Sequence, residues 1–155
     1  MPSTLAGASV WEEELYSHLT HHASDEQATI ERYRELAAGS DSETFRYLVA
    51  QIVEDEKRHH RWMADLAATI KSASDMSDPP LPTLDLERAG PDVLAATDEL
   101  LRIERADRKA LKRLEKDLSE VRDTTIWALI VHLMLIETDK HIAILDFVRH
   151  HVHVR

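Results

Sequence analysis

The sequence predicts an all-α fold in which four long helices pack as a bundle. Apolar residues recur in alternating steps of three and four along four separate stretches, which is the spacing of one helix face. The 155 residues include only 3 glycines and 5 prolines, and 43% of them are apolar, which suits long helices around a shared core. A chain of this length is expected to form a single domain, residues 1–155.

Local signals mark where the helices should begin and end. The first should end at Gly39, and the second should begin at a capping box formed by Ser40 and Glu43. Pro91 lies near the first turn of the third, and Asp123 is the expected N-cap of the fourth. The expected helices cover approximately residues 10–38, 42–72, 91–118 and 123–150.

The connections between the helices set the predicted topology. The first and last connections are short, so they should join antiparallel neighbours. The middle linker, at about residues 73–90, contains three prolines and could reach about 60 Å when extended. We therefore expect two antiparallel hairpins joined by a long crossover, with an up-down-up-down bundle as the alternative.

Charge and composition argue against several classes of protein. A formal net charge of −10 disfavours binding to nucleic acid or to anionic membranes. No run of 18 apolar residues is present, so no membrane span is expected, and without a signal-peptide pattern the expected location is cytoplasmic. Because the chain has no cysteine, it can form neither disulfides nor a cysteine-ligated iron–sulfur centre.

Two strongly polar residues, Glu56 and His59, interrupt the apolar face of the second predicted helix. They follow Val49 and Ile52 and precede Met63 in the same spacing of three and four. Burying an unpaired carboxylate is costly, and a bound metal ion would remove this cost. Glu-x-x-His facing the interior of a bundle is the ligand unit of carboxylate dimetal sites. The pair therefore predicts metal ligands.

The other three apolar stripes each carry a glutamate near the middle of the helix: Glu26, Glu104 and Glu137. All four glutamates should meet at one level, whichever way the helices run. Their negative charges would balance two divalent metal ions, and histidine would add a neutral nitrogen ligand. The fourth stripe also carries His141, four residues after Glu137 and on the same helix face.

Three segments of the chain look like the ligand segments of a known family. Residues 26–28, Glu-Gln-Ala, with Tyr33 seven residues after Glu26, resemble the family's first-helix segment. Residues 54–59 resemble its second-helix segment. Glu104 and Asp107, three residues apart, resemble a pair of acids in its third helix.

This resemblance is to the rubrerythrin and erythrin branch of the ferritin-like superfamily, and it covers about residues 10–150. It implies a ferritin-like four-helix bundle with a non-haem centre of two iron ions, or of manganese or mixed metals, that acts on peroxide or oxygen. Neither haem nor an iron–sulfur cluster is expected. Because the cysteine-ligated rubredoxin domain of rubrerythrins is missing, a separate protein should donate electrons. We also expect the chain to form a homodimer. The metal ligands implied by the resemblance are Glu26, Glu56, His59, Glu104 and Glu137.

The fourth helix departs from the family pattern. Lys140 stands three residues after Glu137, where the family has histidine, and His141 follows one residue later. A spacing of four still keeps Glu137 and His141 on one face, so His141 remains a candidate ligand. His60 and Asp107 are alternative candidate ligands. His22 and Tyr33 are candidates for groups that contact the ligands without binding the metal ion.

Other functions stay open at this point. One is ferroxidase activity linked to iron storage, which assembly into large hollow particles would distinguish. Another is a metal-free helical stress or interaction protein, because the altered fourth-helix motif is compatible with a site that holds one metal ion or none.

Overall fold

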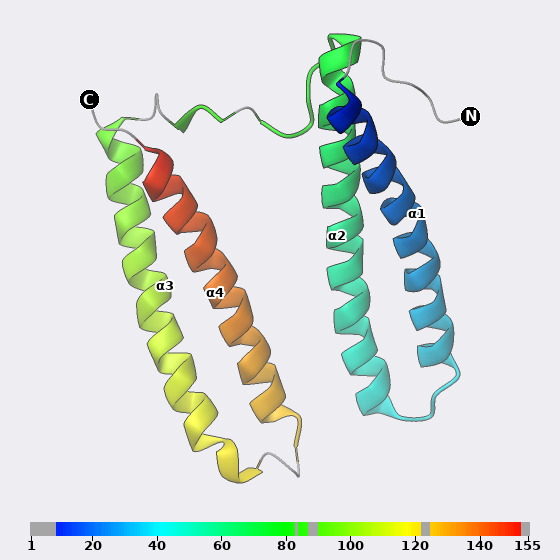
Figure 1. Ribbon diagram of the computed structural model, residues 1–155. Helices are drawn as coiled ribbons and strands as arrows, with labels where there is room; N and C mark the ends of the chain where they lie inside the picture. Colours follow the sequence, from blue (N-terminus) through cyan, green and yellow to red (C-terminus); the bar gives the residue numbers. More distant parts are fainter. Residues whose placement is uncertain (1–8, 83, 87–89, 122–124, 153–155) are drawn as a thin grey trace. The chain divides into compact units, whose positions relative to one another are not determined.

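The computed structural model describes residues 9–82, 84–86, 90–121 and 125–152, and within these ranges it contains α-helices and no strand. The long helices are α1 (Val10–Ala38), α2 (Glu43–Asp75), α3 (Pro91–Asp117) and α4 (Trp127–His151), with a short 3₁₀ helix at Ser119–Val121 (Figure 1). The predicted all-α class with four long helices is confirmed. The chain divides between residues 83 and 84 into two compact units, each of which is one antiparallel hairpin.

Side chains at the first hairpin's helix ends explain its boundaries. Ser9 and Glu12 form a capping box at the start of α1, in which the Ser9 backbone N–H donates to the Glu12 carboxylate at 2.7 Å. This hydrogen bond lowers the pKa of Glu12, because it stabilises the charged carboxylate. At the other end, the Gly39 N–H donates to the Glu35 carbonyl at 3.1 Å and closes the last turn.

The N-cap of α2 differs from the capping box expected at Ser40 and Glu43, which was wrong. The N-cap is Ser42, whose hydroxyl accepts a hydrogen bond from the Phe45 N–H at 3.2 Å. Glu43 is the first helical residue, so Ser40 lies too far upstream to cap the helix. α2 also continues to Asp75, beyond the expected end near residue 72.

The second hairpin agrees with the expected third helix and differs at the fourth. α3 begins at Pro91 in its first turn, where a missing N–H costs nothing. α4 begins at Trp127 after Ile126, which makes no side-chain capping hydrogen bond. The N-cap expected at Asp123 lies outside the described residues.

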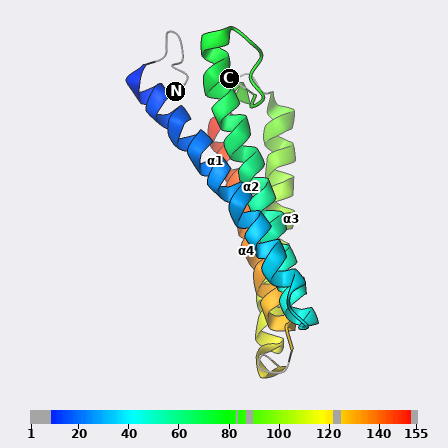
Figure 2. The same cartoon turned by 90° about the vertical axis from the view of Figure 1, so that its right-hand side faces the viewer.

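A compact apolar cluster joins α1 to α2. Ile30 is only 2% exposed and packs against Val49 and Val53, with Tyr33 and Ala37 packed on the edge. Figure 2 shows α1 crossing α2 at an angle, so that the first turns of α1 diverge from α2. The α1 residues of the cluster, Ile30, Tyr33 and Ala37, lie toward the other end of this helix.

The α3–α4 hairpin combines an apolar cluster with ion pairs between its helices. Leu111 of α3 packs against Val131 and Leu135 of α4, with Leu118 at the edge. The polar pairs that follow the antiparallel register along the hairpin include Asp98–Arg149 at 2.9 Å, Arg108–Asp139 at 2.5 Å, and Glu115–His132 at 2.8 Å.

Burial follows a somewhat different helix face from the one expected. In α2, Val53 is buried, whereas Ile52, which belongs to the expected apolar face, is exposed. In α4 the buried residues are Ala128, Val131, Leu135 and Thr138, so burial includes Thr138 and not its neighbour Glu137, which belongs to the expected face. A wide apolar stripe can turn either edge toward one partner helix, and each hairpin buries only the edge that faces its partner.

None of the helices in the described part of the chain is long and apolar enough to cross a membrane.

We expect Ile30→Ala to lower the free energy of unfolding by about 2–5 kcal/mol, because it leaves a cavity between α1 and α2. The control is Leu36→Ala on the same helix, where the side chain is 47% exposed and the expected cost is about 0.5 kcal/mol. Urea unfolding followed by helical circular dichroism measures both, and equal losses would contradict the position of this core.

Candidate metal centre

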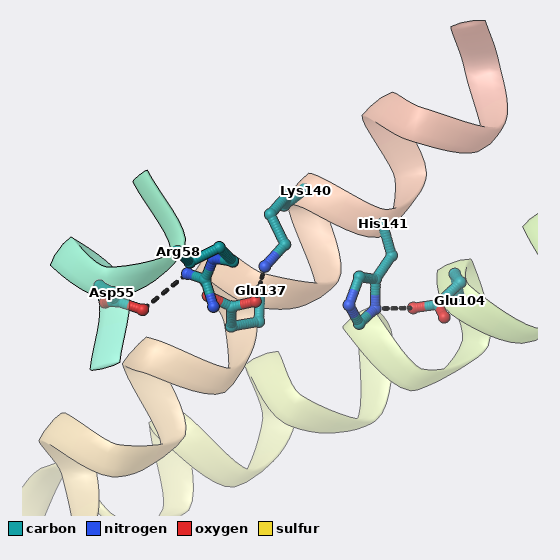
Figure 3. Close-up of polar contacts among 6 residues, drawn as sticks. All are labelled: Asp55, Arg58, Glu104, Glu137, Lys140 and His141. Carbon is teal, nitrogen blue, oxygen red and sulfur yellow. Dashed lines mark hydrogen bonds and ion pairs between the residues drawn. The ribbon is translucent and has the colours of Figure 1, made fainter. Parts of the chain in front are cut away.

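The α3–α4 hairpin brings together two candidate ligands that lie 37 residues apart in the sequence. Nδ1 of His141 on α4 lies 3.4 Å from Oε2 of Glu104 on α3, and Figure 3 shows the ring turned toward the carboxylate. The antiparallel register places these residues at one level. The Glu104 side chain is 25% exposed and that of His141 is 48% exposed, so the pair lies at the edge of the helix contact.

The contact uses only one nitrogen of the His141 ring. When Nδ1 carries the proton and donates to Glu104, Nε2 is the nitrogen that could bind a metal ion. A carboxylate in this position fixes the orientation of the imidazole and makes it a better ligand. The same carboxylate could instead bind the metal ion directly, since carboxylate oxygen and imidazole nitrogen often share one ion.

Glu137, the other candidate ligand of α4, contacts a lysine. The ammonium group of Lys140, three residues later on the same helix face, donates to Oε2 of Glu137 (Figure 3). The sequence shows Lys140 at the position of the family's histidine but does not show this ion pair. A spacing of three between opposite charges on a helix is the signal that could have revealed it.

The α1–α2 hairpin holds the second glutamate–histidine pair. Nδ1 of His59 lies 3.9 Å from Oε2 of Glu56 on the same helix, with side chains 44% and 26% exposed. The fourth candidate glutamate, Glu26, is a helical residue of α1, and its side chain lies outside the described part of the structure. The Glu56 side chain is partly buried.

The remaining candidates lie in varied surroundings. Nδ1 of His60 is buried and has no hydrogen-bond partner among the described residues. Asp107 is exposed, and so is His22, whose ring centre lies 6.2 Å from that of His18. Tyr33 packs against the apolar cluster around Ile30, which gives it a packing role in the hairpin.

The chemistry of the two glutamate–histidine pairs fits metal binding. Each offers a carboxylate oxygen and an imidazole nitrogen within 4 Å of each other, the kinds of atom that Fe²⁺ and Mn²⁺ accept. No group of three or more such side chains converges among those described, which do not include Glu26. The expected ligands come from both hairpins, and each hairpin holds one of the two pairs.

Cations of both hairpins are paired with acids that were not candidate ligands. On α2, Lys57 donates to Glu54 at 2.5 Å and Arg58 to Asp55 at 2.6 Å, so the two acids that directly precede Glu56 in the sequence are each paired with a cation (Figure 3 shows the second pair). On α4, Asp139 accepts from Arg108 of α3. This hydrogen bond is the main cause that lowers the pKa of Asp139.

Comparison with known proteins does not assign the chain to a family. A scan against protein-family models found no matching family, and searches of curated proteins and of solved structures found no match.

We expect Arg108→Gln to raise the pKa of Asp139 toward its ordinary value, because the variant loses the charged hydrogen-bond donor. A carboxyl with a lowered folded-state pKa stabilises the fold above its unfolded pKa, and this contribution disappears as the pH falls through the folded value. An NMR titration of the Asp139 carboxyl carbon measures the shift.

Arg113→Gln is the control, since it removes another arginine charge from α3. An unchanged Asp139 pKa in Arg108→Gln, or an equal rise in both variants, would contradict a specific contact between Arg108 and Asp139.

Proposed function

We propose that this chain is a ferritin-like, non-haem dimetal redox protein that acts on peroxide or oxygen, with iron as the metal. The observation that carries the proposal is the contact between Glu104 and His141 on different helices. Two residues selected as ligands from sequence patterns 37 positions apart lie within 3.4 Å of each other. The Glu56–His59 pair supports the proposal with the same two ligand types in the other hairpin.

The side chains of the chain would act mainly by binding and orienting. The carboxylates of Glu26, Glu56, Glu104 and Glu137 would offset the charge of the metal ions. His59 and His141 would supply neutral nitrogen ligands, and the Glu104 carboxylate would hold the His141 ring in one orientation. When bound, two ferrous ions would supply the two electrons that reduce peroxide to water.

The helix contact next to Glu104 would limit access of water to one side of this site. Leu101, three residues before Glu104, is 1% exposed, and Thr138 of α4 is buried as well. A low-dielectric wall strengthens the attraction between carboxylates and a metal ion. We further propose that a separate protein returns the electrons and that the chain is a homodimer.

We expect the full chain, loaded with Fe²⁺ without oxygen and desalted, to retain about two iron ions, as dimetal carboxylate sites do. Glu56→Ala should lose stoichiometric iron, because the carboxylate and its contact with His59 are removed. Elemental analysis measures the metal, and ultraviolet absorbance after one equivalent of peroxide reports oxidation of the bound iron. His150, His151 and His153 are replaced by glutamine in every sample, so that they cannot chelate iron.

Glu54→Ala is the matched control, since Glu54 lies two residues away on α2 and pairs with Lys57. It should retain the iron of the starting protein. A folded protein that retains no iron would refute the proposal and favour a metal-free helical protein, whereas assembly into hollow particles would favour iron storage.

A further inference from the structure

Lys140 places a positive charge beside one of the candidate ligands of the α3–α4 hairpin. Its ammonium group contacts the carboxylate of Glu137, and His141 is the next residue on the helix. We infer that Lys140 weakens metal binding by the α3–α4 ligands, so that the two metal ions bind in separate steps, with the α1–α2 ligands filled first. This inference rests on the proposed dimetal function.

The geometry of α4 makes this competition direct. Lys140 follows Glu137 by three residues, so both side chains project from one helix face. The Lys140 and Glu137 side chains are 33% and 43% exposed, so water can solvate both charged groups when they separate. An exposed ion pair of this kind contributes little to stability, so a metal ion can displace it.

The charge of Lys140 nevertheless acts on any ion that takes its place. A unit charge about 4 Å from a divalent ion reduces the ion's affinity about 30-fold, even with the dielectric constant of water. The repulsion falls as the lysine swings outward, but a four-carbon side chain on the same helix face keeps its charge within the screening length.

The α1–α2 hairpin arranges its positive charges differently. Lys57 contacts Glu54 and Arg58 contacts Asp55, and neither acid is a candidate ligand. The candidate ligand Glu56 has His59 beside it instead. Because histidine is itself a ligand, this contact favours metal binding, whereas the lysine beside Glu137 opposes it.

The test is an anaerobic titration with Co²⁺, whose visible absorbance reports imidazole and carboxylate ligation, with metal content measured by elemental analysis. It uses the full chain with His150, His151 and His153 replaced by glutamine. The starting protein should bind two ions in resolved steps. Lys140→Gln should tighten the second step about 4- to 30-fold and leave the first unchanged, because it removes a unit charge that lies between about 10 and 4 Å from the ion.

Two control variants test whether the effect depends on a positive charge at position 140. Lys140→Arg keeps the charge and should keep the weak second step. Lys71→Gln removes a lysine that pairs with Asp75 at 3.7 Å, far along α2 from Glu56, and should change neither step.

The outcomes distinguish the inference from the function on which it rests. Two ions bound with equal affinity, in both the starting protein and Lys140→Gln, would overturn the role of Lys140 and leave the dimetal proposal standing. Absence of stoichiometric Co²⁺ from every variant would overturn both.

Discussion

The antiparallel contact between two long helices is the constraint on which the rest of this chain depends. In each hairpin the antiparallel packing of the helices sets a register, and the register decides which side chains lie at one level. Across α3 and α4 it aligns Glu104 with His141 and Arg108 with Asp139. A shift of a single turn, about 5.4 Å, would separate both pairs. The candidate centre is thus a consequence of how the helices pair.

The candidate ligands lie at the edge of each hairpin's apolar contact, where their side chains are partly exposed to water. Glu56 and Glu104 are each about one quarter exposed, so water can still solvate them when no metal ion is present. A fully buried carboxylate would have to be neutralised for the hairpin to fold. Partial exposure lets the hairpins form first and leaves the carboxylate oxygens open to a metal ion.

Much of this arrangement could be predicted from the sequence, and the remainder has physical reasons. Periodic apolar residues predict the helices, and short connections predict that consecutive helices run antiparallel. The same spacing cannot decide whether Ile52 or Val53 is buried, because one wide stripe offers two edges to a partner. The spacing of residues also cannot decide whether Glu137 binds a metal ion or Lys140. Both are cations, and the outcome depends on which of them Glu137 binds with the more favourable free energy.

The central claim is that histidines and carboxylates from these hairpins hold metal ions. X-ray absorption spectroscopy of the iron-loaded full chain, with its C-terminal histidines replaced, tests it most directly. The account predicts a mixed shell of oxygen and nitrogen ligands, with imidazole scattering that decreases in His141→Ala. An all-oxygen shell that is the same in both proteins would contradict it.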